Sequence, residues 1–185
     1  MSTEIRENVA WEEYEALLKE HDVEDSLRLT YDRGVLEILH PVGAHEEVNQ
    51  RAAAIVESLL RGRGKTYENR GSLTFKRRES RRGVDPDTCF YIQNADAARG
   101  KTTAELETGN PPPDLVIEID DPTPSLSKLP LFSEFEFPEV WRIVGREAFI
   151  MTLQANGQYV ERDHSLAIAN VTIEQLNDLL QESGA

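Results

Sequence analysis

Acidic side chains alternate along an apolar segment of the chain, PPPDLVIEIDD at residues 111–121. Asp114, Glu118 and Asp120 are separated by even numbers of residues, so they share one face if the segment is a β-strand. An unpaired charge in such an apolar setting is costly. These acids therefore either accept local hydrogen bonds or pair with arginine, or they form a site that uses their charge. For Asp114 we expect the first role, as the cap of a turn after the prolines.

A second Pro-Asp pair occurs earlier, in VDPDTCFYI at residues 84–92, which we predict to be a neighbouring strand. Acids from adjacent strands can converge on one divalent cation, which prefers oxygen ligands. Such a cation can activate water for the hydrolysis of a phosphodiester bond. We therefore predict that Asp87, Glu118 and Asp120 are metal ligands for Mg²⁺ or Mn²⁺. Lys128, ten residues after Glu118, could stabilise the developing negative charge as a catalytic group.

The bulk composition limits the possible classes of protein. With 185 residues, the chain is expected to form one domain over residues 1–185 with a sizeable core. A single cysteine, Cys89, excludes an internal disulfide framework and a zinc site made of cysteines. No apolar run reaches the roughly 20 residues of a membrane helix, and the polar N-terminus does not resemble a signal peptide. We expect a cytoplasmic protein without a membrane partner.

A short basic segment, KRRESRR at residues 76–82, stands out in a chain with a formal net charge of −14. The overall charge argues against sequence-blind binding to nucleic acid, because affinity for phosphate comes chiefly from lysine and arginine. The segment is either a solvated hairpin tip or a basic prong beside an acidic site. In the second interpretation its arginines contact the DNA backbone, and the predicted contacts are Arg77, Arg78, Arg81 and Arg82.

The patterns of apolar residues predict a mixed α and β fold. The helices are expected at 10–20, 44–64, 125–137 and 172–183, the last one capped by Thr172. A hairpin is expected over 26–41, and further strands at 65–70, 71–77, 84–92, 113–119, 140–145, 147–154 and 157–163. The sum is a sheet flanked by helices, with antiparallel hairpins at its margins.

The order of the motifs resembles the Uma2 family, which is abundant in cyanobacteria. The matching segments are GVLEILHPVGAHEEV (34–48), PDTCF (86–90), PDLVIEI (113–119), KLPLF (128–132) and PEVW (138–141). The resemblance spans about residues 10–160. It implies the restriction-endonuclease-like fold of the PD-(D/E)xK superfamily, with a mixed central sheet flanked by helices.

The resemblance also implies roles for particular residues. Asp87 matches the motif aspartate and Glu118 the acid of the (D/E)xK element. Asp120 stands where the superfamily has its lysine, and Lys128 matches a lysine that the Uma2 pattern places on the next helix. The sequence departs from the pattern at 120–124, where Asp-Asp-Pro-Thr-Pro replaces Ser-Pro-Ser, and at Phe132, where tyrosine is usual.

The first long helix of the superfamily often adds another site residue. On a helical wheel His45 falls close to the buried side and Glu47 at its margin, so His45 is the first candidate and Glu47 the second. An ordinary hydrogen-bonded core histidine is the alternative.

Together these features predict a metal-dependent endonuclease that hydrolyses DNA with Mg²⁺ or Mn²⁺. Two alternatives remain open from the sequence. One is a catalytically silent member of the same fold that acts as a binding or regulatory module, often as a homodimer. The other is an acidic protein-interaction domain without a nucleic-acid partner.

Overall fold

A computed structural model describes residues 2–21, 27–108, 110–120 and 126–182. The helices are α1 (Trp11–His21), α2 (Gly43–Gly62), α3 (Ala95–Ala98), α4 (Thr103–Leu106), α5 (Leu129–Glu134) and α6 (Ile173–Glu182). In the described residues no helix is both long and apolar enough to cross a membrane.

Sheet A is antiparallel and has five strands in the order β1-β3-β2-β6-β5. They are β1 (Ser2–Arg6), β2 (Arg28–Asp32), β3 (Val35–His40), β5 (Phe75–Arg77) and β6 (Arg82–Val84). β2 and β3 form the predicted hairpin, with Gly34 at a φ of 102° in its turn, a conformation that favours glycine.

Sheet B is mixed and has six strands in the order β11-β10-β9-β8-β7-β4. They are β4 (Glu68–Asn69), β7 (Thr88–Tyr91), β8 (Leu115–Asp120), β9 (Glu139–Val144), β10 (Glu147–Leu153) and β11 (Tyr159–Arg162). β8 and β9 run parallel, whereas the other neighbours pair antiparallel. The predicted meander is the run from β9 to β11.

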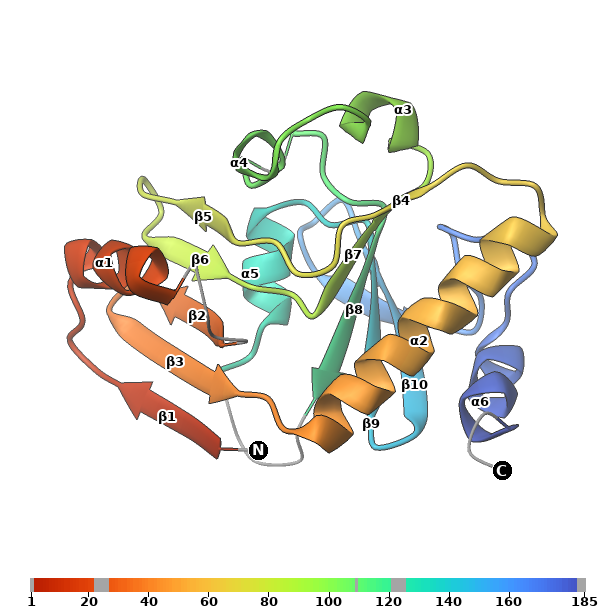
Figure 1. Cartoon of the computed structure of the whole chain (residues 1–185), viewed down its shortest axis with the longest axis horizontal. Coiled ribbons are helices and arrows are strands. Elements are labelled where there is room, and N and C mark those ends of the chain that lie inside the picture. The colour runs from red at the N-terminus through yellow and green to blue at the C-terminus, as the bar shows by residue number, and fades with distance from the viewer. Residues whose placement is uncertain (1, 22–26, 109, 121–125, 183–185) are drawn as a thin grey trace.

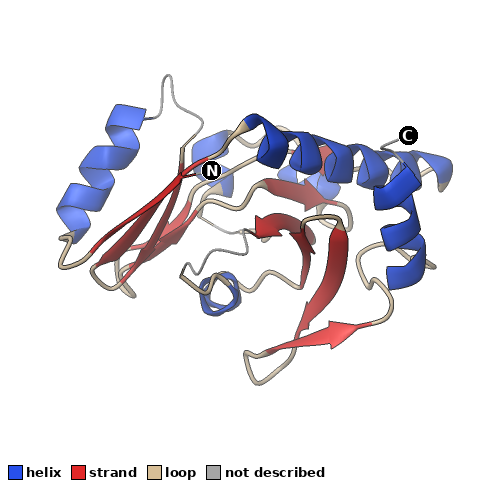
Figure 2. Cartoon of the chain, turned by 90° about the horizontal axis from the view of Figure 1, so that it is seen from below, coloured by secondary structure: helices blue, strands red, loops and turns tan. Residues whose placement is uncertain are grey.

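Helices cover the sheets in separate layers (Figures 1 and 2). The aromatic residues Trp11 and Tyr14 of α1 pack on Tyr31 of sheet A. α2 and α6 cover one face of sheet B through a continuous apolar cluster that includes the fully buried Trp141. α5 lies between the two sheets, where Phe132 belongs to a cluster drawn from both of them.

The predicted strand over 84–92 is wrong, because two strands share that segment. Val84 ends β6 in sheet A and Thr88 begins β7 in sheet B, so residues 85–87 cross from one sheet to the other. Pro86 lacks an amide hydrogen and cannot continue a strand ladder. The crossing places Asp85 and Asp87 at the junction of the sheets.

Other boundaries also differ from the predictions. The strands expected over 65–70 and 71–77 shrink to β4 and β5, and β1, α3 and α4 were not predicted. The helix expected over 125–137 is reduced to α5, which has its proline in the first turn. Thr172 caps α6 as predicted, since its Oγ1 accepts the amide of Gln175 at 3.2 Å.

Candidate active site

Two acidic side chains meet at the junction of the sheets, one just before β7 and one on β8. Thr88 of β7 pairs with Ile117 of β8. Because the strands are antiparallel, Asp87, one residue before Thr88, comes next to Glu118, one residue after Ile117. The amide of Ile119 donates a 2.8 Å hydrogen bond to Asp87 Oδ2, which ties the aspartate to β8. Both acids are buried, at 1% and 2% exposure. The sequence prediction that these two residues lie together agrees with this geometry.

Lys128 reaches this pair from the start of α5. Its Nζ donates a short hydrogen bond to Glu118 Oε1, and its side chain is only 9% exposed. Its backbone carbonyl accepts the amides of Leu131 and Phe132 at 2.9 Å each, so the first turn of α5 fixes the residue. The start of α5 thus brings a lysine into direct contact with Glu118.

For Glu118 and for Lys128 alike, burial shifts the pKa in one direction, and the attraction between the two groups shifts it in the other. Burial raises the pKa of the Glu118 carboxyl to about 8, while Lys128 opposes the shift and Asp87 adds to it. Burial alone would lower the pKa of Lys128, but attraction to Glu118 and Asp87 is stronger and the pKa lies above its usual value. Lys128 therefore stays charged, and Glu118 readily holds a proton near neutral pH.

The start of α2 supports Asp87. His45 is buried, and its Nε2 lies 3.5 Å from Asp87 Oδ2. One turn later, Asn49 accepts a 2.9 Å hydrogen bond from the hydroxyl of Thr88, and its Nδ2 lies 3.5 Å from the carbonyl of Asp87. Glu47 does not join this buried group. Its side chain is 69% exposed and pairs with Arg51 on the surface of α2. This position corrects the sequence-based suggestion that Glu47 contributes to the site.

Asp120 lies two residues beyond Glu118 on β8, as the alternation predicts, and its charge contributes to the raised pKa of Glu118. Its carboxylate accepts a 2.6 Å hydrogen bond from Arg142 Nε on the parallel strand β9. The altered segment after Asp120 lies outside the described residues. Asp114 is a turn cap, because its Oδ2 accepts the amides of Ile92 and Asn94 at 2.7 and 2.9 Å.

Sheet A and the crossing that follows it add charged residues that were not predicted from the sequence. Arg28 Nε lies 3.5 Å from Asp87 Oδ1. Asp85 holds the neighbouring residue, Leu29, since its Oδ2 accepts the amide of Leu29 at 2.8 Å. Burial raises the pKa of Asp85 to about 6, against the opposing amide of Leu29. Asp85 had a detectable signal, because it is the first acid of the VDPD motif.

Glu37 on β3 is a further buried acid near this region. It is 2% exposed, and its Oε2 accepts the amide of Leu126 at 2.9 Å. Its charge also contributes to the raised pKa of Lys128. A charged residue inside the apolar run VLEILH was the sequence signal for it.

Two arginines of the basic segment point toward α1 and β2. Arg78 bonds Glu12 at 2.9 Å and Glu15 at 2.6 Å. Arg81 donates a 3.1 Å hydrogen bond to the hydroxyl of Tyr31. The segment forms the tip of the β5–β6 hairpin, as one of the two sequence interpretations holds.

The other two arginines of the tip also have internal partners. Arg82 bonds Asp32 and Glu134 at 3.1 Å each. Arg77 donates a 2.7 Å hydrogen bond to the carbonyl of Glu134. The positive charge of the tip is therefore largely balanced within the chain, and DNA contact by these arginines stays a prediction.

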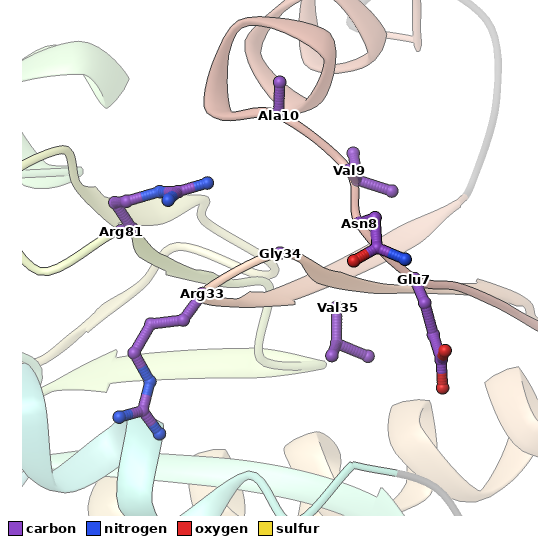
Figure 3. A pocket seen from close by; sticks show the side chains of 8 residues that line it. All are labelled: Glu7, Asn8, Val9, Ala10, Arg33, Gly34, Val35 and Arg81. Atoms are coloured by element: carbon purple, nitrogen blue, oxygen red, sulfur yellow. The ribbon is translucent and has the colours of Figure 1, made fainter.

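A surface pocket of about 480 Å³ lies beside the β2–β3 turn, where Arg33 and Arg81 contribute to its lining (Figure 3). Their guanidinium groups extend to opposite sides of the ribbon at Gly34. Arg33 also pairs with Asp32 at 2.9 Å. The two guanidinium groups therefore do not point toward one another in this pocket.

The carboxylate oxygens of the acidic pair are suited as ligands for a hard divalent cation. Asp87 Oδ1 and Glu118 Oε2 are buried, and neither accepts a hydrogen bond from the described residues. Carboxylate oxygens of this kind are the ligands that Mg²⁺ and Mn²⁺ prefer. In the same part of the chain, no group of three or more His, Cys, Asp or Glu side chains is placed to hold a metal ion. Such an ion would therefore need backbone or water oxygens as well.

Two comparisons with known proteins found a match, one to a family model and one to a solved structure. A family model named Uma2, described as "Putative restriction endonuclease", matches residues 11–180. A crystal structure described as "a putative nuclease belonging to DUF820 from Anabaena variabilis" has a similar fold, with a TM-score of 0.59. Its sequence is 15% identical, and the match covers 93% of this chain and 99% of that chain. Among curated proteins no match was found.

Proposed function

The chain belongs to the Uma2 family, and from this membership and the geometry of the acidic pair we propose that it is a metal-dependent DNA endonuclease. The observation that carries the proposal is the meeting of Asp87, just before β7, with Glu118 on β8 and Lys128 at the start of α5. Buried acids held beside a lysine match the needs of phosphodiester hydrolysis, in which negative charge develops on the phosphate.

In this proposal Asp87 and Glu118, which each have one buried oxygen without a hydrogen bond from the described residues, would hold Mg²⁺ or Mn²⁺. Asp120 would be a third acid, which would first have to leave Arg142. When bound, such an ion supplies a Lewis acid for the phosphate oxygen and lowers the pKa of a water molecule. Because Glu118 readily holds a proton near neutral pH, binding of the ion would release that proton.

The remaining side chains orient the acids. The amide of Ile119 and the imidazole of His45 both lie against Asp87 Oδ2, which leaves Oδ1 on the side of Arg28. Lys128 holds Glu118 through Oε1, and its positive charge would stabilise the extra charge on a phosphate under attack. His45 is therefore proposed as an orienting residue for Asp87.

The proposed DNA contacts are the arginines of the β5–β6 tip. For Arg78 to bind a phosphate, that phosphate must displace the carboxylates of Glu12 and Glu15. Exposed ion pairs of this kind are weak, so exchange is feasible. Loss of one phosphate contact should lower affinity about equally for all DNA sequences and reduce the salt dependence of binding.

The direct test is cleavage of supercoiled plasmid DNA with Mg²⁺ or Mn²⁺. Asp87→Asn should lower the rate by at least about a hundredfold, since even loss of a residue behind a metal ligand costs about 10–100-fold. Asp114→Asn is the matched control, because it changes a buried acid that binds backbone amides away from the pair. Cleavage that persists unchanged in Asp87→Asn would refute this site.

A catalytically silent scaffold is the second candidate, favoured by the direct pairing of Lys128 with Glu118. In that arrangement the lysine balances the acid and no ion is required. Calorimetric titration with Mn²⁺ separates the two candidates. The nuclease should bind Mn²⁺ with an affinity that rises from pH 6 to about pH 8, as Glu118 loses its proton. A scaffold should show no saturable heat of Mn²⁺ binding, and Asp87→Asn should therefore make no difference to the titration.

A further inference from the structure

Glu37 connects sheet A to the segment that carries Lys128. It lies on β3, and its buried carboxylate accepts the amide of Leu126 at 2.9 Å across 89 positions of sequence. Lys128 follows only two residues later. A carboxylate that accepts a backbone amide forms a charge-assisted hydrogen bond, which is stronger than a neutral one.

Lys128 is consequently held from both sides along the chain. On its C-terminal side, the carbonyl of Lys128 accepts the amides of Leu131 and Phe132 in α5. On its N-terminal side, the amide of Leu126 is held by Glu37. The ammonium group itself bonds Glu118. Glu37 is the contact in this set that comes from sheet A.

We propose that Glu37 is a positioning residue that fixes the Leu126–Lys128 segment and so places Lys128 against Glu118. Sheet A thereby completes a site whose acids adjoin sheet B. The catalytic meaning of this placement rests on the proposed nuclease function, whereas the placement itself does not. Glu37 acts mainly through the backbone amide, so a glutamine, which keeps a carbonyl oxygen, should preserve most of the effect.

Acylation of lysines provides a test that needs no enzymatic activity. The full chain is treated briefly with acetic anhydride, and modification of each lysine is read by mass spectrometry. Lys65 is exposed and serves as an internal reference. In the wild-type chain Lys128 should react far more slowly than Lys65, because its side chain is buried and its ammonium group bonds Glu118.

The variants to compare are Glu37→Ala and Glu37→Gln. Glu37→Ala should raise the relative reactivity of Lys128 by at least about tenfold, the factor expected when one hydrogen bond to a charged group is lost. Glu37→Gln should stay within about twofold of the wild type, because the amide of Leu126 keeps an acceptor. Asp114→Ala is the matched control, since it also removes a buried carboxylate that holds backbone amides.

Wild-type reactivity of Lys128 in Glu37→Ala would overturn the proposal, and so would an equal increase in Asp114→Ala, which would indicate general loosening. Far-UV circular dichroism checks that each variant is folded, and Glu37→Gln keeps the test decisive if Glu37→Ala does not fold. In that case a tenfold rise in Glu37→Gln would count against the role of the amide contact.

Activity gives an independent comparison. If the wild type cleaves DNA, Glu37→Ala should lower kcat more than it raises KM, and Glu37→Gln should restore most of kcat. If the wild type does not cleave DNA under any metal condition, the nuclease proposal fails. The labelling of Lys128 still decides whether Glu37 positions it.

Discussion

Replacement of Lys128 by methionine should reveal the protonation state of Glu118 through the stability of the fold. The substitution keeps a long side chain but removes the ammonium group that bonds Glu118 Oε1. Removal of one partner from a buried ion pair costs about 3–5 kcal/mol when the remaining charge cannot be relieved. Glu118 can relieve its charge, because burial already raises the pKa of its carboxyl to about 8.

The cost of Lys128→Met should therefore depend on pH. The folded-state pKa of Glu118 lies above that of the unfolded chain, so its contribution to stability is present at low pH and is lost as pH rises toward about 8. Without Lys128 this pKa is higher still, and the loss continues above pH 8. Each further pH unit then adds about 1.4 kcal/mol to the difference between the variant and the wild type.

The expected destabilisation is about 1–2 kcal/mol at pH 7, from the lost hydrogen bond to a charged donor. At pH 9.5 it should reach about 3–4 kcal/mol. Urea unfolding at the two pH values measures both quantities. In the Glu118→Gln background the same lysine substitution should cost about equally at pH 7 and pH 9.5, because the carboxyl that bonds Lys128 is no longer present to titrate.

Two results would refute this reasoning. One is a destabilisation by Lys128→Met that is equal at pH 7 and pH 9.5. The other is an unchanged rise with pH in the Glu118→Gln background, which would assign the titration to another group. Destabilisation that is already complete at pH 7 would mean that Glu118 is ionised in the wild type.

Two further predictions concern the core. Gly83→Ala should destabilise the chain by about 1–3 kcal/mol in urea unfolding, because a Cβ there would lie 2.1 Å from Tyr14 Oη. Gly62→Ala is the control and should have no such cost, since a Cβ there meets no atom within 4 Å. Equal stability of the two variants would contradict the packing at Gly83. The thiol of Cys89 should react with a disulfide reagent at least about a thousandfold more slowly in the folded chain than in urea, since it is fully buried and burial raises its pKa. Rapid labelling of the folded chain would show that this core opens readily.

The elements that could be predicted from the sequence are those with local signals. β8 follows from its apolar run and α2 from its 3.6-residue stripe, because each pattern records which side of the element is buried. Asp87 and Glu118 could be paired from the two Pro-Asp motifs, since both precede apolar strands. Lys128 could be chosen only through the order of motifs shared with the Uma2 family.

The elements that could not be predicted depend on contacts between sheets. The crossing at residues 85–87 looks continuous in sequence, because Val84 and Cys89 are apolar on either side of it. Glu47 appeared suitable on a helical wheel, but the wheel does not show that α2 turns this residue toward solvent and Arg51. Glu37 lies 89 positions from its partner Leu126, and no local pattern reports such a contact.

The balance of charge at the junction explains how one site can suit both proposed functions. The buried acids that share this junction in the described chain are Glu37, Asp85, Asp87 and Glu118, and the cations facing them are Arg28 and Lys128. Four ionised carboxylates and two cations would leave two uncompensated negative charges in a buried place, which is unfavourable. Protons can remove this excess, as the raised pKa values of Asp85 and Glu118 indicate. A divalent cation carries the same two charges, so protons and metal should compete for the junction.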